Sequence, residues 1–260
     1  TQIKRFKPDV IIHAAAESHV DNSIKTPKKF IKSNIIGTYN LLESVRVNNL
    51  VNKTLFLYIS TDEVFGSTTK NDSFSENYKF YPNSPYSASK ASSDNLVRAW
   101  NKTFKIKTIT TNCCNNYGPF QFPEKLIPLT IKHCLYKKKI PIYGNGKNVR
   151  EWIHVDDHSE IIIKLIKLGR IGETYNIGSG FEITNIDLVK IICTHFNNIF
   201  KNKFNYHDLI EFVKDRKGHD FRYSISNKKL IKEIGNFKFK QIELEILKTI
   251  KWYINFFNAK

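Results

Sequence analysis

Apolar runs alternate with helix-period segments along the first half of the chain. The runs "DVIIHAAA", "TLFLYIS" and "KTITTN" predict buried strands. Between them, "TPKKFIKSNIIGTYNLLESVRVNN" and "SPYSASKASSDNLVRAWNKTF" carry apolar residues at helical spacing, with a proline in each first turn. This β-α-β-α-β order predicts a parallel sheet with helices on both faces, and therefore an α/β fold of the Rossmann-like, doubly wound kind.

The second half continues the alternation and ends in an amphipathic segment. Helices are expected at "EKLIPLTIKHCL", "DDHSEIIIKLIKLG" and "TNIDLVKIICTHFNNIF", and strands at "REWIHV" and "ETYNIG". Beyond residue 202 the pattern shortens and closes with "QIELEILKTIKWYINFF". There is neither a repeat nor a low-complexity linker, so we expect a smaller C-terminal lobe packed on the sheet.

Composition indicates a folded protein and excludes several classes. Of the 260 residues, 41% are hydrophobic and 13% aromatic, which suits a globular core. The net charge of +17 comes from lysines spread over the chain, and the longest basic run is only Lys137 to Lys139. We therefore expect no nucleic-acid partner. No apolar run approaches membrane-spanning or signal-peptide length, so we expect no membrane association and a cytoplasmic location.

The cysteines predict no metal site and no disulfide framework. Cys113, Cys114, Cys134 and Cys193 lack the paired spacing of metal ligands, and the simplest interpretation is reduced core residues.

Two carboxylates follow one of the predicted strands. Asp62 and Glu63, in "STDEVFGS", come directly after the apolar run. A turn or a helix cap explains such acids equally well. In an open parallel sheet, however, ligands bind at the carboxyl ends of the strands, and "AAAES" occupies the corresponding place after the first strand. This position favours a catalytic or ligand-binding role for the two acids over a turn or a cap.

A tyrosine and a lysine share one face of the following helix. Tyr86 and Lys90 are four residues apart at its start. A phenol has a pKa near ~10, and a neighbouring ammonium lowers it by stabilising the phenolate. Such a pair can take a proton from a sugar hydroxyl while a nicotinamide takes the hydride. Thr61, at the preceding strand end, can supply the hydroxyl of a Thr, Tyr and Lys constellation.

Several motifs together identify a family resemblance. "AAAESHVDNS", "SNIIGTYNLLE", "STDEVFG", "SPYSASKASSDNLVRAW", "TNCCNNYGPFQFPEKLIPL", "PIYGNGKNVREWIHVDDH", "GETYNIGS" and "DRKGHDFRY" closely resemble the dTDP-glucose 4,6-dehydratase family of extended short-chain dehydrogenases/reductases. The resemblance covers nearly the whole chain. Families that only epimerise or decarboxylate nucleotide sugars share the Tyr and Lys pair but lack an Asp-Glu dyad after the strand-end Thr.

The resemblance implies an NAD-dependent hydro-lyase that acts on dTDP-glucose. Carbon 4 of the glucose is oxidised, water is eliminated across carbons 5 and 6, and the hydride returns to carbon 6. The resemblance assigns Glu63 as the base on carbon 5 and Asp62 as the acid at the departing oxygen. Thr61 would hydrogen-bond the oxygen on carbon 4, Tyr86 would accept its proton, and Lys90 would hold the cofactor ribose and tune Tyr86. The implied setting is dTDP-rhamnose and lipopolysaccharide O-antigen biosynthesis.

Further site residues follow from the resemblance by position. Those facing NAD are Ala14, Ala15, Ala16, Glu17, Ser18, Ser33, Tyr86, Lys90 and Asn116. Those facing the nucleotide sugar are Ser18, Thr61, Asn115, Lys125, Leu126, Pro141, Ile142, Tyr143, Arg150, Asn185, Asp215, Arg216, Lys217, Gly218 and His219. Residues 1–120 would form the remainder of the NAD-binding domain, and residues 121–260 would be mainly the nucleotide-sugar lobe, with some segments returning to the sheet.

Four positions depart from or stand outside the resemblance. Lys217 stands where the family usually has proline. His13, His154 and His158 are interpreted as structural, because the sequence gives them no acid-base partner.

The start of the chain also departs from the family pattern. A glycine-rich turn normally holds the cofactor pyrophosphate, but the only glycines before residue 100 are Gly37 and Gly66. We therefore expect the first two βα units to be absent from this sequence, and the 260 residues alone to lack NAD binding and turnover.

Two alternatives remain open from the sequence. One is another nucleotide-sugar epimerase or dehydratase, which the Asp62 and Glu63 dyad disfavours. The other is a non-catalytic remnant that keeps the fold.

The resemblance also implies a homodimer through a four-helix interface. The interface would be built from the helices at 27–49 and 84–104, whose apolar residues include Ile35, Leu41, Leu96, Val97 and Trp100.

Overall fold

Four parallel strands form the main sheet of the molecule. The computed structural model describes residues 2–69, 71–201 and 203–259. The strand order is β1 (Val10–His13), β2 (Leu55–Thr61), β3 (Lys107–Cys113) and β7 (Thr174–Ile177). Leu55 pairs with Lys107 and Thr61 with Cys113, so β2 and β3 end level with each other. The predicted α/β class with a parallel sheet is confirmed.

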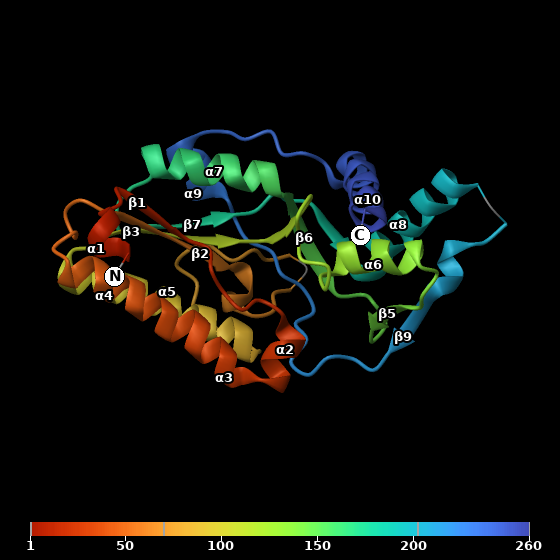
Figure 1. The fold of residues 1–260 in the computed structure, drawn as a ribbon, viewed down its shortest axis with the longest axis horizontal. Coiled ribbons are helices and arrows are strands. Elements are labelled where there is room, and N and C mark those ends of the chain that lie inside the picture. Colours follow the sequence, from red (N-terminus) through yellow and green to blue (C-terminus); the bar gives the residue numbers. More distant parts are fainter. Residues whose placement is uncertain (1, 70, 202, 260) are drawn as a thin grey trace.

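Helices cover both faces of this sheet (Figure 1). On one face lie α3 (Pro27–Phe30), α4 (Gly37–Val47) and α5 (Pro85–Phe104), and on the other α7 (Val155–Leu168) and α9 (Lys228–Ile234). The alternation along β2 explains the two layers, since side chains of neighbouring strand residues point to opposite faces. Leu55 and Leu57 belong to the core beneath α7, whereas Phe56 and Tyr58 pack with α4 and α5.

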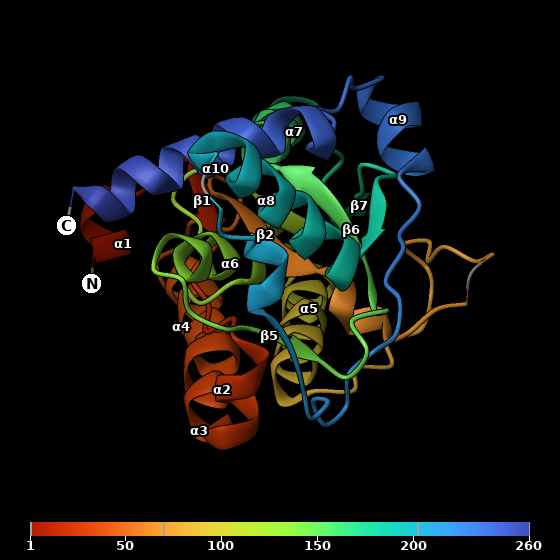
Figure 2. The ribbon, with the colours of Figure 1, turned by 90° about the vertical axis from the view of Figure 1, so that its right-hand side faces the viewer.

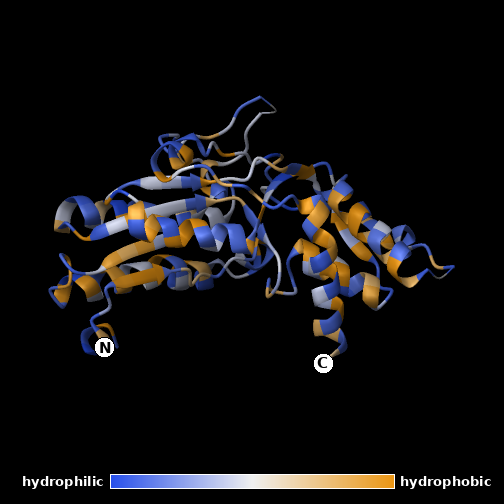
Figure 3. Ribbon diagram, turned by 90° about the horizontal axis from the view of Figure 1, so that it is seen from above, coloured by the Kyte–Doolittle hydropathy of each residue, from blue (hydrophilic) through white to orange (hydrophobic). Residues whose placement is uncertain are grey.

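The second lobe is mostly helical. Its helices are α6 (Leu126–Leu135), α8 (Asn185–Phe200) and α10 (Ile242–Asn258), which crosses over the other two (Figures 1 and 2). One apolar cluster joins all three helices, with Trp152 on its sheet side. Figure 3 shows hydrophobic and hydrophilic residues interleaved along these helices, as expected where one face of each is buried.

Two small sheets accompany the main sheet. The first pairs β4 (Asn115–Tyr117) with β6 (Val149–His154) in parallel, and β6 with β8 (Glu182–Thr184) in antiparallel fashion. The second pairs β5 (Ile140–Tyr143) with β9 (Ile210–Val213). The alternation predicted β6, but β4, β5, β8 and β9 are three- or four-residue strands and carry too short a pattern to be recognised.

The remaining short elements lie mostly at strand ends. They are α1 (Gln2–Phe6), α2 (Val20–Lys25), a 3₁₀ helix at Asp62–Phe65 and another at Tyr206–Leu209. The helix predicted over 26–49 is interrupted, because Ile31–Ile36 is a π-helical segment. A π turn contains an extra residue and often marks a functional position. Here it contains the buried Asn34, whose side chain bonds both the N–H and the carbonyl of Glu17 at 2.9 and 3.0 Å.

None of the helices in the described ranges combines the length and apolarity that a bilayer crossing requires. Within those same ranges, no three His, Cys, Asp or Glu side chains are grouped as a metal site would need.

Candidate active site

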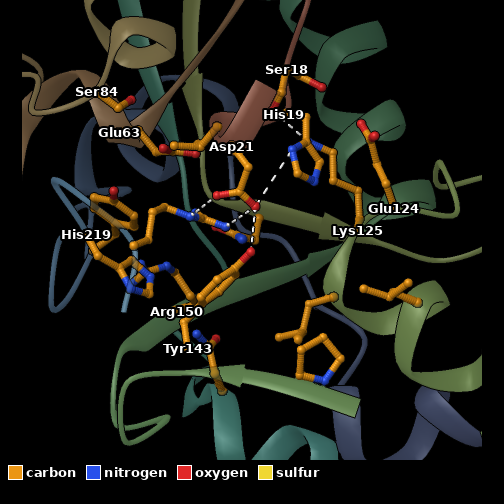
Figure 4. A pocket seen from close by; sticks show the side chains of 18 of the residues that line it. Ser18, His19, Asp21, Glu63, Ser84, Glu124, Lys125, Tyr143, Arg150 and His219 are labelled. Carbon is orange, nitrogen blue, oxygen red and sulfur yellow. Dashed lines mark hydrogen bonds and ion pairs between the residues drawn. The ribbon is translucent and has the colours of Figure 1, made fainter. Parts of the chain in front are cut away.

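A cavity of about 430 Å³ is lined by residues of both lobes (Figure 4). Its lining includes thirteen positions expected from the sequence, namely Ser18, Glu63, Asn115, Lys125, Leu126, Pro141, Ile142, Tyr143, Arg150, Asn185, Arg216, Gly218 and His219. The other expected positions lie outside this lining: Ala14, Ala15, Ala16, Glu17, Ser33, Thr61, Asp62, Tyr86, Lys90, Asn116, Asp215 and Lys217. The structure therefore gathers most of the expected sugar-nucleotide positions around one space.

Asp62 is held beneath the cavity surface. Its side chain is 1% exposed, and the Thr61 hydroxyl donates to its Oδ1 at 3.2 Å. Its Oδ2 is buried without a hydrogen-bond partner among the described residues. Burial raises the pKa of Asp62 well above the ordinary value, and the nearby charges of Glu63 and Glu151 raise it further. Asp62 therefore holds its proton more tightly than an exposed carboxyl does.

Glu63 is half-buried and faces the cavity. Its backbone N–H donates to the Thr61 hydroxyl at 3.3 Å, so Thr61 caps the 3₁₀ helix that carries both acids. Burial raises the pKa of Glu63, while Arg150, Lys125 and Arg216 pull it down. Glu63 thus loses its proton more readily than Asp62. The two adjacent carboxyls can hold different protonation states, as an acid and a base must.

A turn fixes the direction in which the dyad is presented. Gly66 follows the 3₁₀ helix with φ of +79°, and a Cβ there would collide with the carbonyl oxygen of Tyr81. The backbone conformation and the close approach both require glycine.

Tyr86 stands in the first turn of α5. Ser84 and Ser87 form a reciprocal capping box there, with Ser84 Oγ accepting from Ser87 N at 3.1 Å, and Pro85 occupies the first helical position. Such a cap stabilises a helix start by about 1 kcal/mol. Tyr86 is buried, and its hydroxyl interacts with Thr61. Burial, followed by the charge of Glu63, raises the pKa of Tyr86 well above its ordinary value.

In this arrangement of side chains Lys90 is engaged with β2, and its expected effect on the pKa of Tyr86 stays a prediction. Lys90 Nζ donates to the carbonyl of Ile59 at 2.7 Å and lies 4.2 Å from the centre of the Tyr58 ring. Burial lowers the pKa of Lys90 to about 8. Burial is thus the main cause of the raised pKa of Tyr86, while Lys90 contacts β2.

A buried polar network supports this end of β2. Asp94 Oδ2 accepts from Ser60 Oγ at 2.9 Å and from Asn112 Nδ2 at 3.3 Å, and Asn112 also donates to the carbonyl of Thr61. Burial raises the pKa of Asp94 to about 7, opposed by Lys90 one helical turn away. The sequence analysis missed Asp94. Its place one helical turn after Lys90 could have identified it as a neighbour of that lysine.

The arginines expected at the diphosphate side are not free surface residues. Arg150 is 7% exposed, donates to the backbone carbonyls of Val149 and Asp220, and lies 4.3 Å from the Tyr223 ring centre. Lys125 Nζ donates to the carbonyl of Ser18 at 2.6 Å, which joins the two lobes.

Sequence analysis also missed His19 and Asp21, which line the same cavity. Figure 4 shows Asp21 pointing toward its centre. Asp21 comes three residues after Ser18, on the first turn of α2. It belongs to the motif "AAAESHVDNS", of which only the residues at the strand end were assigned to the site. Glu151, another missed acid, is 1% exposed and accepts from Gly180 N at 2.7 Å, and burial raises its pKa to about 7.

The three histidines interpreted as structural stand apart from the cavity lining. His13 Nε2 contacts Thr38 Oγ1 at 2.9 Å. His154 accepts from the backbone of Asp156 and lies 3.5 Å from its carboxylate, so it has an acidic neighbour that the sequence analysis did not identify. Burial lowers the pKa of His158 to about 4.

Known proteins resemble this chain over nearly its whole length. A family model described as GDP-mannose 4,6 dehydratase matches residues 1–244. A probable dTDP-glucose 4,6-dehydratase of Sinorhizobium fredii is 46% identical over 255 residues, which are 96% of this chain and 73% of that protein. A dTDP-glucose 4,6-dehydratase of Escherichia coli is 46% identical over 96% of this chain and 74% of its own length. The chain belongs to the dTDP-glucose 4,6-dehydratase family.

Solved structures agree with this membership. The dTDP-glucose 4,6-dehydratase of Streptomyces venezuelae, with NAD and dTDP bound, has a TM-score of 0.90 and 40% identity, covering 98% of this chain and 76% of its own. A UDP-glucuronic acid 4-epimerase of Bacillus cereus has a TM-score of 0.87 but only 23% identity, and so shows the shared fold alone. The family resemblance read from the motifs is confirmed.

Proposed function

We propose that the enzyme dehydrates dTDP-glucose to dTDP-4-keto-6-deoxyglucose through the Asp62 and Glu63 dyad. Family membership supports the reaction and its hydro-lyase class. The observation that carries the residue assignment is the unequal setting of the dyad, with Asp62 buried and Glu63 lining the cavity.

In the oxidation half of the reaction, Thr61 and Tyr86 act on the hydroxyl at carbon 4. Thr61 positions its oxygen, and Tyr86 accepts its proton. NAD, when bound, supplies the hydride acceptor and later the hydride donor. Lys90 would hold the cofactor ribose and, in that position, stabilise the phenolate form of Tyr86.

The residues around Tyr86 fit the reactive half of NAD. Asn116 Oδ1 is buried without a partner among the described residues, so an acceptor is available for a carboxamide. Ala14 and Ala15 are exposed at the carboxyl end of β1, where the cofactor of a parallel sheet binds. We assign Ala16, Glu17, Ser18 and Ser33 to the same side. The bond of Asn34 to Glu17 holds this strand end in place.

In the elimination half, the dyad acts on carbons 5 and 6. The ketone at carbon 4 acidifies the proton on carbon 5, and Glu63 removes it. Asp62 gives its proton to the oxygen on carbon 6, which leaves as water. Hydride returns to carbon 6 and a proton to carbon 5, so the product is the 4-keto-6-deoxy sugar. The high pKa of Asp62 keeps the required proton in place until that step.

The nucleotide and its diphosphate are assigned to the second lobe. Lys125, Arg150 and Arg216 bring positive charge to the cavity, and all three lower the pKa of Glu63. The remaining residues of this assignment are Asn115, Leu126, Pro141, Ile142, Tyr143, Asn185, Asp215, Lys217, Gly218 and His219. Residues 1–120 would thus serve mainly the cofactor, and residues 121–260 mainly the nucleotide sugar.

A homodimer is proposed through the outer face of α3, the π segment, α4 and α5. Ile31, Ile36 and Tyr39 are 45%, 46% and 41% exposed, which is unusual for neighbouring large apolar residues. Val97, expected at this interface, is fully buried in the core and cannot contribute to it. A cytoplasmic location and a role in dTDP-rhamnose and O-antigen synthesis complete the proposal.

Product analysis tests the proposed function. The protein, expressed from its whole reading frame and supplied with NAD, is incubated with dTDP-glucose, and the products are identified by NMR. A 4-keto-6-deoxy sugar is expected. A 4-epimer that keeps its carbon 6 hydroxyl would favour the epimerase alternative, and bound nucleotide without any product would favour the non-catalytic one.

A further inference from the structure

The cavity contains an anion-binding position that the chain itself occupies. Arg216 Nε lies 2.7 Å from Asp21 Oδ1, and Arg216 Nη2 donates to Asp21 Oδ2 at 3.3 Å. The hydroxyl of Tyr143 donates to the same Oδ2 at 2.9 Å, and the guanidinium lies 4.9 Å from the Tyr143 ring centre. A guanidinium fork with one added hydroxyl donor is equally suited to phosphate oxygens.

The partners come from opposite lobes. Asp21 is on α2, beside the sheet, whereas Tyr143 ends β5 and Arg216 follows β9 in the second lobe. Their ion pair is half-buried, with side-chain exposures of 20% for Arg216 and 22% for Asp21. All three residues line the cavity, so the carboxylate stands inside the space that a ligand would enter.

We propose that Asp21 is a specificity-determining residue whose carboxylate competes with the substrate diphosphate for Arg216 and Tyr143. The inference rests on the proposed function, which places the diphosphate at this end of the cavity. A phosphate group takes the place of the Asp21 carboxylate and accepts the hydrogen bonds that Arg216 and Tyr143 had given to it. A ligand without phosphate cannot accept these hydrogen bonds, and therefore leaves the carboxylate in place.

The displaced carboxylate has a second partner close by. Asp21 Oδ2 lies 4.0 Å from His19 Nδ1, and that nitrogen is buried without a hydrogen-bond partner among the described residues. Burial lowers the pKa of His19, so a neutral ring that donates from Nδ1 suits this role. The exchange therefore need not leave Asp21 unpaired.

Calorimetric titrations of dTDP and of thymidine test the competition. Asp21→Asn removes the competing charge but keeps the shape, and should tighten dTDP binding by about fivefold or more, a usual size for coupling between sites. Thymidine binding should not change. Glu124→Gln is the matched control, because Glu124 is a second carboxylate in the lining that does not contact Arg216, and its effect should be clearly smaller.

A double-mutant cycle ties the effect to the arginine. In an Arg216→Gln background, Asp21→Asn should no longer tighten dTDP binding, because no fork remains to be released. The inference is overturned if Asp21→Asn weakens dTDP binding or leaves it unchanged, if thymidine gains equally, or if the gain persists without Arg216. If neither the wild type nor any variant binds dTDP, the proposed nucleotide site is wrong, and the inference with it.

Discussion

Asp62 and Glu63 are adjacent in the chain, yet the hydroxyl of Thr61 contacts the carboxylate of one and the backbone N–H of the other. The strand end thus directs the first acid into the protein and the second into the cavity. Burial raises the pKa of both carboxyls, and neighbouring cations oppose that rise at Glu63. Only Glu63 has three such cations around it.

Replacing the base should separate oxidation from elimination. We expect Glu63→Gln to form NADH on mixing with dTDP-glucose but to release product about 10² to 10⁴ times more slowly, which is the usual contribution of a general base. Absorbance at the NADH band and a product assay measure the two steps. Normal turnover to the 4-keto-6-deoxy sugar in this variant would refute the assignment of the base.

The pH dependence should follow the cations around Glu63. Because Lys125 lowers the pKa of Glu63, Lys125→Met should raise that pKa and move the acidic limb of kcat to higher pH. The rate must be measured at saturating substrate, since Lys125 is also assigned to binding. Lys167→Met, on the exposed side of α7, is the control and should leave the limb in place. A shift to lower pH would contradict the proposed sign.

His13 should make the fold sensitive to acid. The Thr38 hydroxyl donates to the Asn34 carbonyl and therefore accepts from His13 Nε2. Burial lowers the pKa of His13 to about 4 from 6.5. The folded state then binds the proton less readily than the unfolded chain, so stability is lost as pH falls from 6.5 toward 4. The loss amounts to about 3 kcal/mol.

Urea unfolding at pH 7.5 and pH 5 checks the role of His13. The free energy of unfolding of the wild type should fall more between these pH values than that of His13→Gln. In the control variant His207→Gln, which changes a half-buried histidine, the free energy of unfolding should fall between these pH values as much as in the wild type. Equal slopes for His13→Gln and wild type would show that His13 does not titrate in this range.

The exposed apolar residues Ile31, Ile36 and Tyr39 should control the formation of the dimer. Ile36→Asp is expected to convert a dimer into a monomer, because it places a charge in a desolvated interface. Ile163→Asp is the matched control, since Ile163 is 53% exposed on α7, which covers the other face of the sheet. Light scattering at micromolar concentration gives the mass. A wild-type monomer, or an unaffected Ile36→Asp dimer, would contradict this interface.

Long periodic elements were predictable from the sequence, because each displays its burial pattern over several turns. The strands β2 and β3 and the helices α5, α7, α8 and α10 lie where the apolar period places them. The π segment was not predictable. The chain around Asn34 keeps a helical pattern, and only the tertiary bonds from its side chain to Glu17 and Ser89 show why the helix widens there.

The cavity lining was predictable by motif, but its electrostatics were not. Matching positions along the chain identified Arg150 and Arg216 without showing what they contact. Arg150 is engaged by backbone carbonyls, and Arg216 by the carboxylate of Asp21, which comes from the other lobe. Such pairings depend on how distant segments pack, and no local pattern records them.

The fate of the hydrogen on carbon 4 tests the central claim most directly. The protein, expressed from its whole reading frame and supplied with NAD, is given dTDP-glucose that carries deuterium at carbon 4, and the product is examined by NMR. Internal oxidation, elimination and hydride return predict deuterium on carbon 6 of a 4-keto-6-deoxy sugar. Deuterium retained at carbon 4, with the carbon 6 hydroxyl intact, would contradict the dehydratase assignment.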